Sequence, residues 1–107
     1  GSGQPALVDG VGLAASFNRP AAMDNDGRML YVADRYNHAI RGVMLGSAEV
    51  STIAGSGATG SADGVGGAAR FHGPTGLALS GTTLFVADQL NSAIRAIAIA
   101  TRMLALI

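Results

Sequence analysis

The sequence predicts an all-β fold of short antiparallel strands, and three observations support this prediction. Of its 107 residues, 49% are hydrophobic, only 5% are aromatic and 16 are glycine. This composition is typical of short strands joined by tight turns rather than of long helices. Apolar segments with strand-type periodicity alternate with turn residues, and the whole pattern occurs twice.

An internal duplication covers nearly the entire chain. One constant shift, applied without a gap, aligns DGVGLAASFNRP (9–20) with DGVGGAARFHGP (63–74) and LYVADRYNHAIR (30–41) with LFVADQLNSAIR (84–95). The similarity between the two copies is far above chance. We therefore divide the chain into two repeat units, residues 1–54 and residues 55–107.

Each unit is predicted to contain four strands. Those of the first unit are 21–24, 28–34, 39–45 and 49–55, with the hairpin signal Asn25-Asp26-Gly27 after the first of them. Those of the second unit are 75–79, 83–88, 93–100 and 103–107. The Ala and Leu content of 92–107 also suits a helix, but the aligned first copy has Gly42, Gly46 and a β-branched segment there, which favours strands. Four antiparallel strands joined by hairpins describe a β-propeller blade.

These residues resemble the NHL-repeat β-propellers. The resemblance rests on the two DGVG segments, the two VAD-containing strands and the strand VSTIAG. The signature that names the family, Asn-His-Leu, corresponds here to Asn37-His38-Ala39 and Asn91-Ser92-Ala93. The resemblance implies blades of a six-bladed ring that mostly binds partners, while a minority of the family bind RNA or act as enzymes.

Two blades are too few to close a ring, because propellers have four to eight. A two-bladed chain would also leave two apolar faces uncovered. Head-to-tail association of identical chains would cover both faces and close the ring. We expect three chains to form six blades; two chains would give four blades, and four chains would give eight. The cut at a repeat boundary favours a fragment or an engineered two-repeat chain, with a natural short gene as the alternative.

Asp34 and Asp88 end equivalent strands, and Asn37 and Asn91 follow in the turns. The structural interpretation is that each carboxylate accepts backbone N–H groups of its turn while each Asn takes a left-handed conformation. If 35–38 is the loop, Asp34 faces Ala39 and lies diagonally from Arg41. The alternative, a metal bound by rings of Asp, lacks a second ligand at fixed spacing.

The glycines of DGVG suggest a phosphate-binding loop only superficially, because no long helix and no Lys follow them. We expect them to turn the chain between blades and to place Phe17 or Phe71 in the blade interface. His38 and His72 have no nucleophile or acidic partner beside them in the sequence, so a turn or surface role is expected for each. The sequence therefore predicts no catalytic, cofactor-binding or metal-binding residue.

We expect the loops 35–38 and 89–92 and the inter-blade segments 9–20 and 63–74 to share one face of the ring. Propellers commonly bind ligands on such a face. The candidate ligand or partner residues there are Arg19, Arg35, Tyr36, His38, Arg70 and His72.

The chain is predicted to be a self-assembling scaffold or binding module whose partners are its own copies and a protein or small molecule on the loops. The alternative is a metal-dependent lyase or hydrolase that uses the central opening of the ring. Zero net charge, 13% charged residues and the absence of Lys argue against nucleic acid as a partner. The most apolar stretch, 96–107, is too short to span a bilayer and contains Arg102, so no membrane association is expected.

Overall fold

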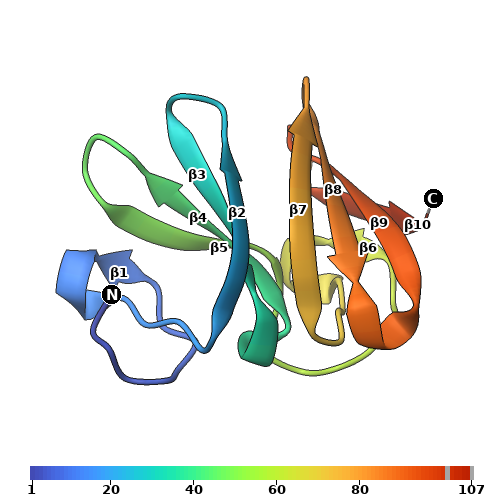
Figure 1. Cartoon of the computed structure of the whole chain (residues 1–107), viewed down its shortest axis with the longest axis horizontal. Coiled ribbons are helices and arrows are strands. Elements are labelled where there is room, and N and C mark those ends of the chain that lie inside the picture. Colours follow the sequence, from blue (N-terminus) through green and yellow to red (C-terminus); the bar gives the residue numbers. More distant parts are fainter. Residues whose placement is uncertain (101, 107) are drawn as a thin grey trace.

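A computed structural model describes residues 1–100 and 102–106 of the chain. Two antiparallel sheets stand side by side, one formed by each repeat (Figure 1). No helix in the described residues is long and apolar enough to cross a membrane. The two sheets are the two β-propeller blades that the duplication predicts.

The first sheet has the strand order β1-β5-β4-β3-β2. Its elements are β1 (Gly10–Val11), the 3-10 turn η1 (Gly12–Ala14), β2 (Pro20–Asn25), β3 (Met29–Asp34), the 3-10 turn η2 (Arg35–Asn37), β4 (Ala39–Met44) and β5 (Glu49–Gly55). The turn after β2 is closed by the Asp26 carboxylate, which accepts the N–H groups of Arg28 and Met29. This confirms the hairpin predicted from the turn signal.

The second sheet repeats this arrangement in the order β6-β10-β9-β8-β7. Its elements are β6 (Gly64–Val65), the 3-10 turn η3 (Gly66–Ala68), β7 (Pro74–Ser80), β8 (Thr83–Asp88), the 3-10 turn η4 (Gln89–Asn91), β9 (Ala93–Ala98) and β10 (Met103–Leu106). Strands rather than a helix therefore occupy Ala93–Ala98 and Met103–Leu106. Ile107, the last residue of the predicted final strand, lies outside the described residues.

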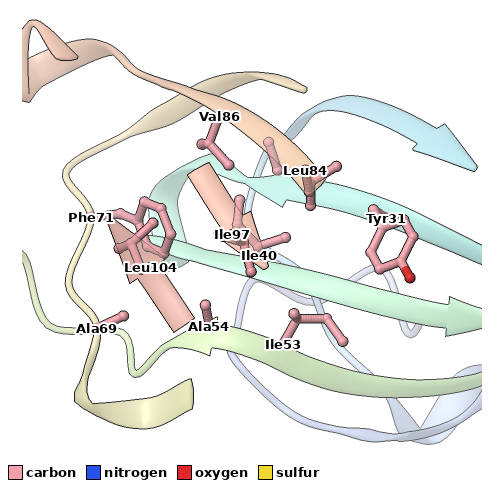
Figure 2. Packing of buried hydrophobic residues seen from close by; sticks show 11 residues of the cluster. Tyr31, Ile40, Ile53, Ala54, Ala69, Phe71, Leu84, Val86, Ile97 and Leu104 are labelled. Atoms are coloured by element: carbon pink, nitrogen blue, oxygen red, sulfur yellow. The ribbon is translucent and has the colours of Figure 1, made fainter. Parts of the chain in front are cut away.

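The strands β2 and β7 run next to each other, and the hydrophobic core lies between the two sheets to which they belong (Figure 1). The buried cluster consists of Tyr31, Ala33, Ile40, Ile53 and Ala54 from the first repeat, and Ala69, Phe71, Leu84, Val86, Ile97 and Leu104 from the second (Figure 2). Full burial of one large aliphatic or aromatic side chain stabilises a fold by about 1.5–3 kcal/mol. Phe71 thus lies in the blade interface as predicted, whereas its counterpart Phe17 is only half-buried on the outside of the first sheet.

Each sheet has five strands, one more than predicted. The additional strands β1 and β6 have two residues each and pair with β5 and β10 at the outer edge of the blade. A strand of two residues is too short to show a periodicity in the sequence. The part of segment 9–20 around Gly12 lies at the other end of the sheet from loop 35–38, because the Gly12 N–H donates to the Ala48 carbonyl, in the turn that joins β4 to β5.

Candidate functional site

A buried ionic network fixes the loops of the first blade. The Arg41 guanidinium donates to Asp34 Oδ2 and to Asp9 Oδ1, both at 2.9 Å, and also to the carbonyls of Ser16 and Val8. Asp34 and Arg41 are both 0% exposed. The predicted pairing across the β3–β4 hairpin is confirmed, since Asp34 lies opposite Ala39 and binds Arg41.

The second blade repeats this network around Asp88. Arg95 donates to Asp88 Oδ2 at 2.9 Å and to Asp63 Oδ1 at 2.7 Å. Its bonds to the carbonyls of Ser61 and Ala62 are 3.2 Å long, whereas Arg41 reaches the carbonyl of Val8, the counterpart of Ala62, at 2.8 Å. Arg95 and Asp63 also border an open groove of about 670 Å³, so solvent comes close to this second network.

Two details of the predicted turn are wrong. Asp34 Oδ1 accepts the N–H of Asn18, which belongs to the inter-blade segment and not to the turn after Asp34. The left-handed residue is His38, with φ of 51°, rather than Asn37. The reason is that Asn37 belongs to the 3-10 turn η2, where its side-chain amide donates to Asp34 Oδ2 and to the Ala6 carbonyl. The second blade shows the same arrangement, with Ser92 left-handed.

Three of the candidate residues gather around one exposed aromatic ring. The Arg19 guanidinium carbon lies 5.5 Å from the centroid of the Tyr36 ring, and that of Arg35 lies 5.3 Å from it. The Tyr36 N–H donates to the Asn18 carbonyl at 3.0 Å, which holds the turn against the residue next to Arg19. We call Arg19, Arg35 and Tyr36 the Arg–Tyr–Arg cluster, and Tyr36 is 48% exposed within it.

The two histidines meet at the junction of the blades. Their ring centroids are 5.5 Å apart with the planes at 77°, and His38 Nδ1 accepts the Gly73 N–H at 3.0 Å. Burial and the His72 imidazole lower the pKa of His38 from its ordinary value of 6.5, while Asp88 opposes this shift. The neutral imidazole of His38 is therefore the form that joins the two blades.

The sixth candidate, Arg70, binds the backbone of its own segment. Its guanidinium donates to the carbonyls of Gly67 and Ala69 in its own segment. Among the described residues, no three His, Cys, Asp or Glu side chains come close enough together to hold a metal ion.

Sequence reasoning missed two acidic residues. Asp9 completes the Arg41 network, and its presence in both repeats, as Asp9 and Asp63, was the available signal. Asp24 accepts the Leu79 N–H at 2.8 Å across the blade junction, and this bond is the largest cause of its lowered pKa. Asp24 has Ala78 at the equivalent position, so the repeat gave no signal for it.

Rigid sheets that hold connecting loops by buried ionic networks define a β-propeller binding or scaffold module. Known proteins agree with this class. The chain is 34% identical over 105 residues to human NHL repeat-containing protein 2, and this region covers 94% of the chain and 14% of that protein. It is 40% identical over 90 residues to SUPPRESSOR OF QUENCHING 1, chloroplastic, of Arabidopsis thaliana, which is 81% of the chain and 8% of that protein. No protein-family model matches the chain.

Solved structures show the same fold. The crystal structure of an auxiliary nutrient binding protein from Bacteroides thetaiotaomicron superposes with a TM-score of 0.77 and 26% identity, over 97% of this chain and 26% of that one. A candidate phosphatase from the same organism superposes with a TM-score of 0.75 and 29% identity, over 87% of this chain and 24% of that one. The chain belongs to the NHL-repeat β-propellers. It spans about 14% of the length of NHL repeat-containing protein 2.

Proposed function

We propose that the chain is a self-assembling propeller scaffold, in which copies join head to tail and the loops bind a partner. The observation that carries this proposal is the equivalence between the two uncovered sheet faces and the two halves of the blade interface. Because the repeats have the same fold, the interface inside the chain serves as a template for the interface between chains.

The outer side of the first sheet is the first free face. It carries a groove of about 270 Å³ lined by Phe17, Leu30, Val32, Val43 and Val50, among other residues. Their counterparts in the second repeat, Phe71, Leu84, Val86, Ile97 and Leu104, are all 0% exposed in the core. The first free face therefore has the residues that the second blade uses to pack against the first.

The outer side of the second sheet is the second free face. Its groove of about 250 Å³ is lined in part by Phe85, Ala87 and Ile94. These correspond to Tyr31, Ala33 and Ile40 of the core. Ile40 is 0% exposed whereas Ile94 is 50% exposed, which is the difference that a covering blade makes.

A contact between the first free face of one copy and the second free face of another is heterologous, so it closes into a ring when the rotation divides a full circle. Three copies would form the six blades that the NHL resemblance implies. The Asp and Arg side chains of the two buried networks are engaged with one another and with backbone groups, which supports a structural role and no chemistry of the chain's own.

Light scattering after size-exclusion chromatography tests the proposal. We expect a mass of about three times the 10.6 kDa of one chain. Ile94→Arg should reduce the mass to that of one chain, because an unpaired charge in an apolar interface costs several kcal/mol. Leu90→Arg is the matched control, since Leu90 is 61% exposed and does not line the groove of either free face.

A single-chain mass for the unmodified protein at every concentration would overturn the assembly. Masses of two or four chains would retain head-to-tail assembly but reject the trimer. An unchanged mass for a folded Ile94→Arg chain would reject the second free face as the contact. Stoichiometric metal in the purified protein would favour a metal-dependent enzyme instead.

A further inference from the structure

We infer that the Arg–Tyr–Arg cluster is a docking site for a carboxylate-rich peptide segment of a partner protein. This inference rests on the proposed function as a binding module and names the chemistry of its partner. Three features of the cluster support this inference. Among the described residues its two arginines have no carboxylate partner, Arg19 has a left-handed backbone conformation, and the Tyr36 ring is already in contact with two guanidinium groups.

The first feature is that the two cations lack anions. In the part of the chain that the structure describes, no carboxylate lies within ion-pairing distance of Arg19 or Arg35, whereas Arg41 and Arg95 each pair with two. Both guanidinium groups instead lie over the same exposed Tyr36 ring. Two cations gathered around one surface ring attract anionic groups, and each planar guanidinium matches a carboxylate with two parallel hydrogen bonds.

The second feature is the backbone of Arg19. Its φ is 57°, in the left-handed region, and its counterpart in the second repeat is Gly73 with φ of 64°. Glycine accepts this conformation without a steric penalty, whereas arginine does not. The counterparts of Arg35 and Tyr36 are Gln89 and Leu90, so all three members are replaced by uncharged residues in the second repeat. Strain that persists at one of two otherwise similar sites points to a function there.

The third feature distinguishes a peptide from nucleic acid. Binding along a phosphate backbone requires many cations, whereas this chain has no Lys, zero net charge and only two cations in the cluster. Single-stranded bases also need a free aromatic face on which to stack. The Tyr36 ring already has two guanidinium groups at 5.3 and 5.5 Å from its centroid, so a base would compete with them for the ring. Carboxylates of a peptide fit two guanidinium groups better.

The test is fluorescence anisotropy at low salt with a labelled hexaglutamate peptide, with labelled hexaglutamine as the neutral control. We expect hexaglutamate alone to bind, and its affinity to fall with added salt. Arg19→Gln and Arg35→Gln should each weaken binding by up to about fivefold, the usual effect of removing one solvent-exposed ion pair. Arg28→Gln is the matched control, because Arg28 is an exposed arginine in the β2–β3 turn, beside the charge of Asp26.

The absence of hexaglutamate binding would overturn the inference, as would equal weakening by Arg28→Gln. Tighter binding of a labelled single-stranded RNA decamer, lost in both cluster variants, would replace the peptide with nucleic acid. Light scattering on the same samples separates this site from self-assembly. Peptide binding by a single chain would refute only the assembly, and an assembled chain that binds no hexaglutamate would refute only the site.

Discussion

Replacing Asp34 by alanine removes the centre of the buried network in the first blade. The Asp34 carboxylate accepts the Asn18 N–H at 2.8 Å, the Asn37 amide at 2.6 Å and the Arg41 guanidinium at 2.9 Å. In the variant, the fully buried Arg41 retains only the partly exposed Asp9 as a counter-ion. Breaking a buried pair by removing one partner costs about 3–5 kcal/mol in unfolding free energy. That is a large share of the roughly 5–15 kcal/mol that stabilises a typical domain.

Asp88→Ala makes the matched change in the second blade. It removes the equivalent three hydrogen bonds, from His72, Asn91 and Arg95. Here the guanidinium borders an open groove of about 670 Å³, so water can reach it after the carboxylate is lost. We therefore expect a smaller cost, of about 1–3 kcal/mol, which is typical of a broken hydrogen-bonding partner with access to solvent.

Urea unfolding followed by circular dichroism measures both costs. The comparison is made at a dilution at which light scattering gives the mass of one chain, so that no second copy covers the Asp88 network. Asp34→Ala combined with Arg41→Met should recover part of the lost stability, because the uncompensated charge is then absent. The reasoning is refuted if Asp34→Ala costs less than Asp88→Ala, or if the double variant is less stable than Asp34→Ala alone.

Three further predictions use the same unfolding assay. Because the pKa of His38 is lowered, its contribution to stability is complete above pH 6.5 and is lost as the pH falls below that value. His38→Asn, whose amide oxygen can still accept the Gly73 N–H, should flatten the pH dependence of the unfolding free energy between pH 7 and 5. An unchanged pH profile would exclude His38 as the source of this dependence. Gly55→Ala should lower the unfolding free energy by about 1–3 kcal/mol, because φ of Gly55 is 93° and the added Cβ would lie 2.5 Å from the His38 carbonyl oxygen. An unchanged unfolding free energy would show that the backbone relaxes at this position. Arg19→Gly relieves a left-handed conformation that costs about 1–2 kcal/mol, while glycine adds an entropic cost of about 0.5–1 kcal/mol, so the unfolding free energy should rise by up to about 1 kcal/mol. The variant should also weaken hexaglutamate binding, and a loss of stability would contradict the strain assigned to Arg19.

The duplication made most of the fold predictable. Each strand position was supported by two copies, and the facing of Asp34 and Ala39 followed directly from the hairpin register. The left-handed position was misassigned because Asn is a common left-handed residue, whereas here its amide is needed for two hydrogen bonds. Local preference favoured one role for Asn37, and the tertiary contacts determined another.

The candidate site was predictable only as a set of loop residues. The sequence placed Arg19 and Arg35 in different loops and contained no information on their distance from Tyr36. The N–H of Tyr36 brings them together by donating to the Asn18 carbonyl, and no side-chain pattern encodes that bond. Arg70 lies in an inter-blade segment, as Arg19 does, but its guanidinium donates to the carbonyls of its own segment.

The proposed ring would contain two kinds of blade junction in alternation, one inside each chain and one between neighbouring chains. The two repeats differ at residues that form these junctions. Within a chain, Asp24 accepts the Leu79 N–H and His38 accepts another N–H of the second blade. At the equivalent positions of the second free face lie Ala78 and Ser92, and alanine has no side-chain acceptor. In the proposed ring, the contact between chains would thus have fewer polar bonds and would depend more on apolar burial. Dilution should therefore separate the ring into intact two-bladed chains, with the scattering mass falling to that of one chain while the circular dichroism spectrum stays constant. Loss of the β signal together with the mass would show instead that a chain's own two blades hold together no better than neighbouring chains do.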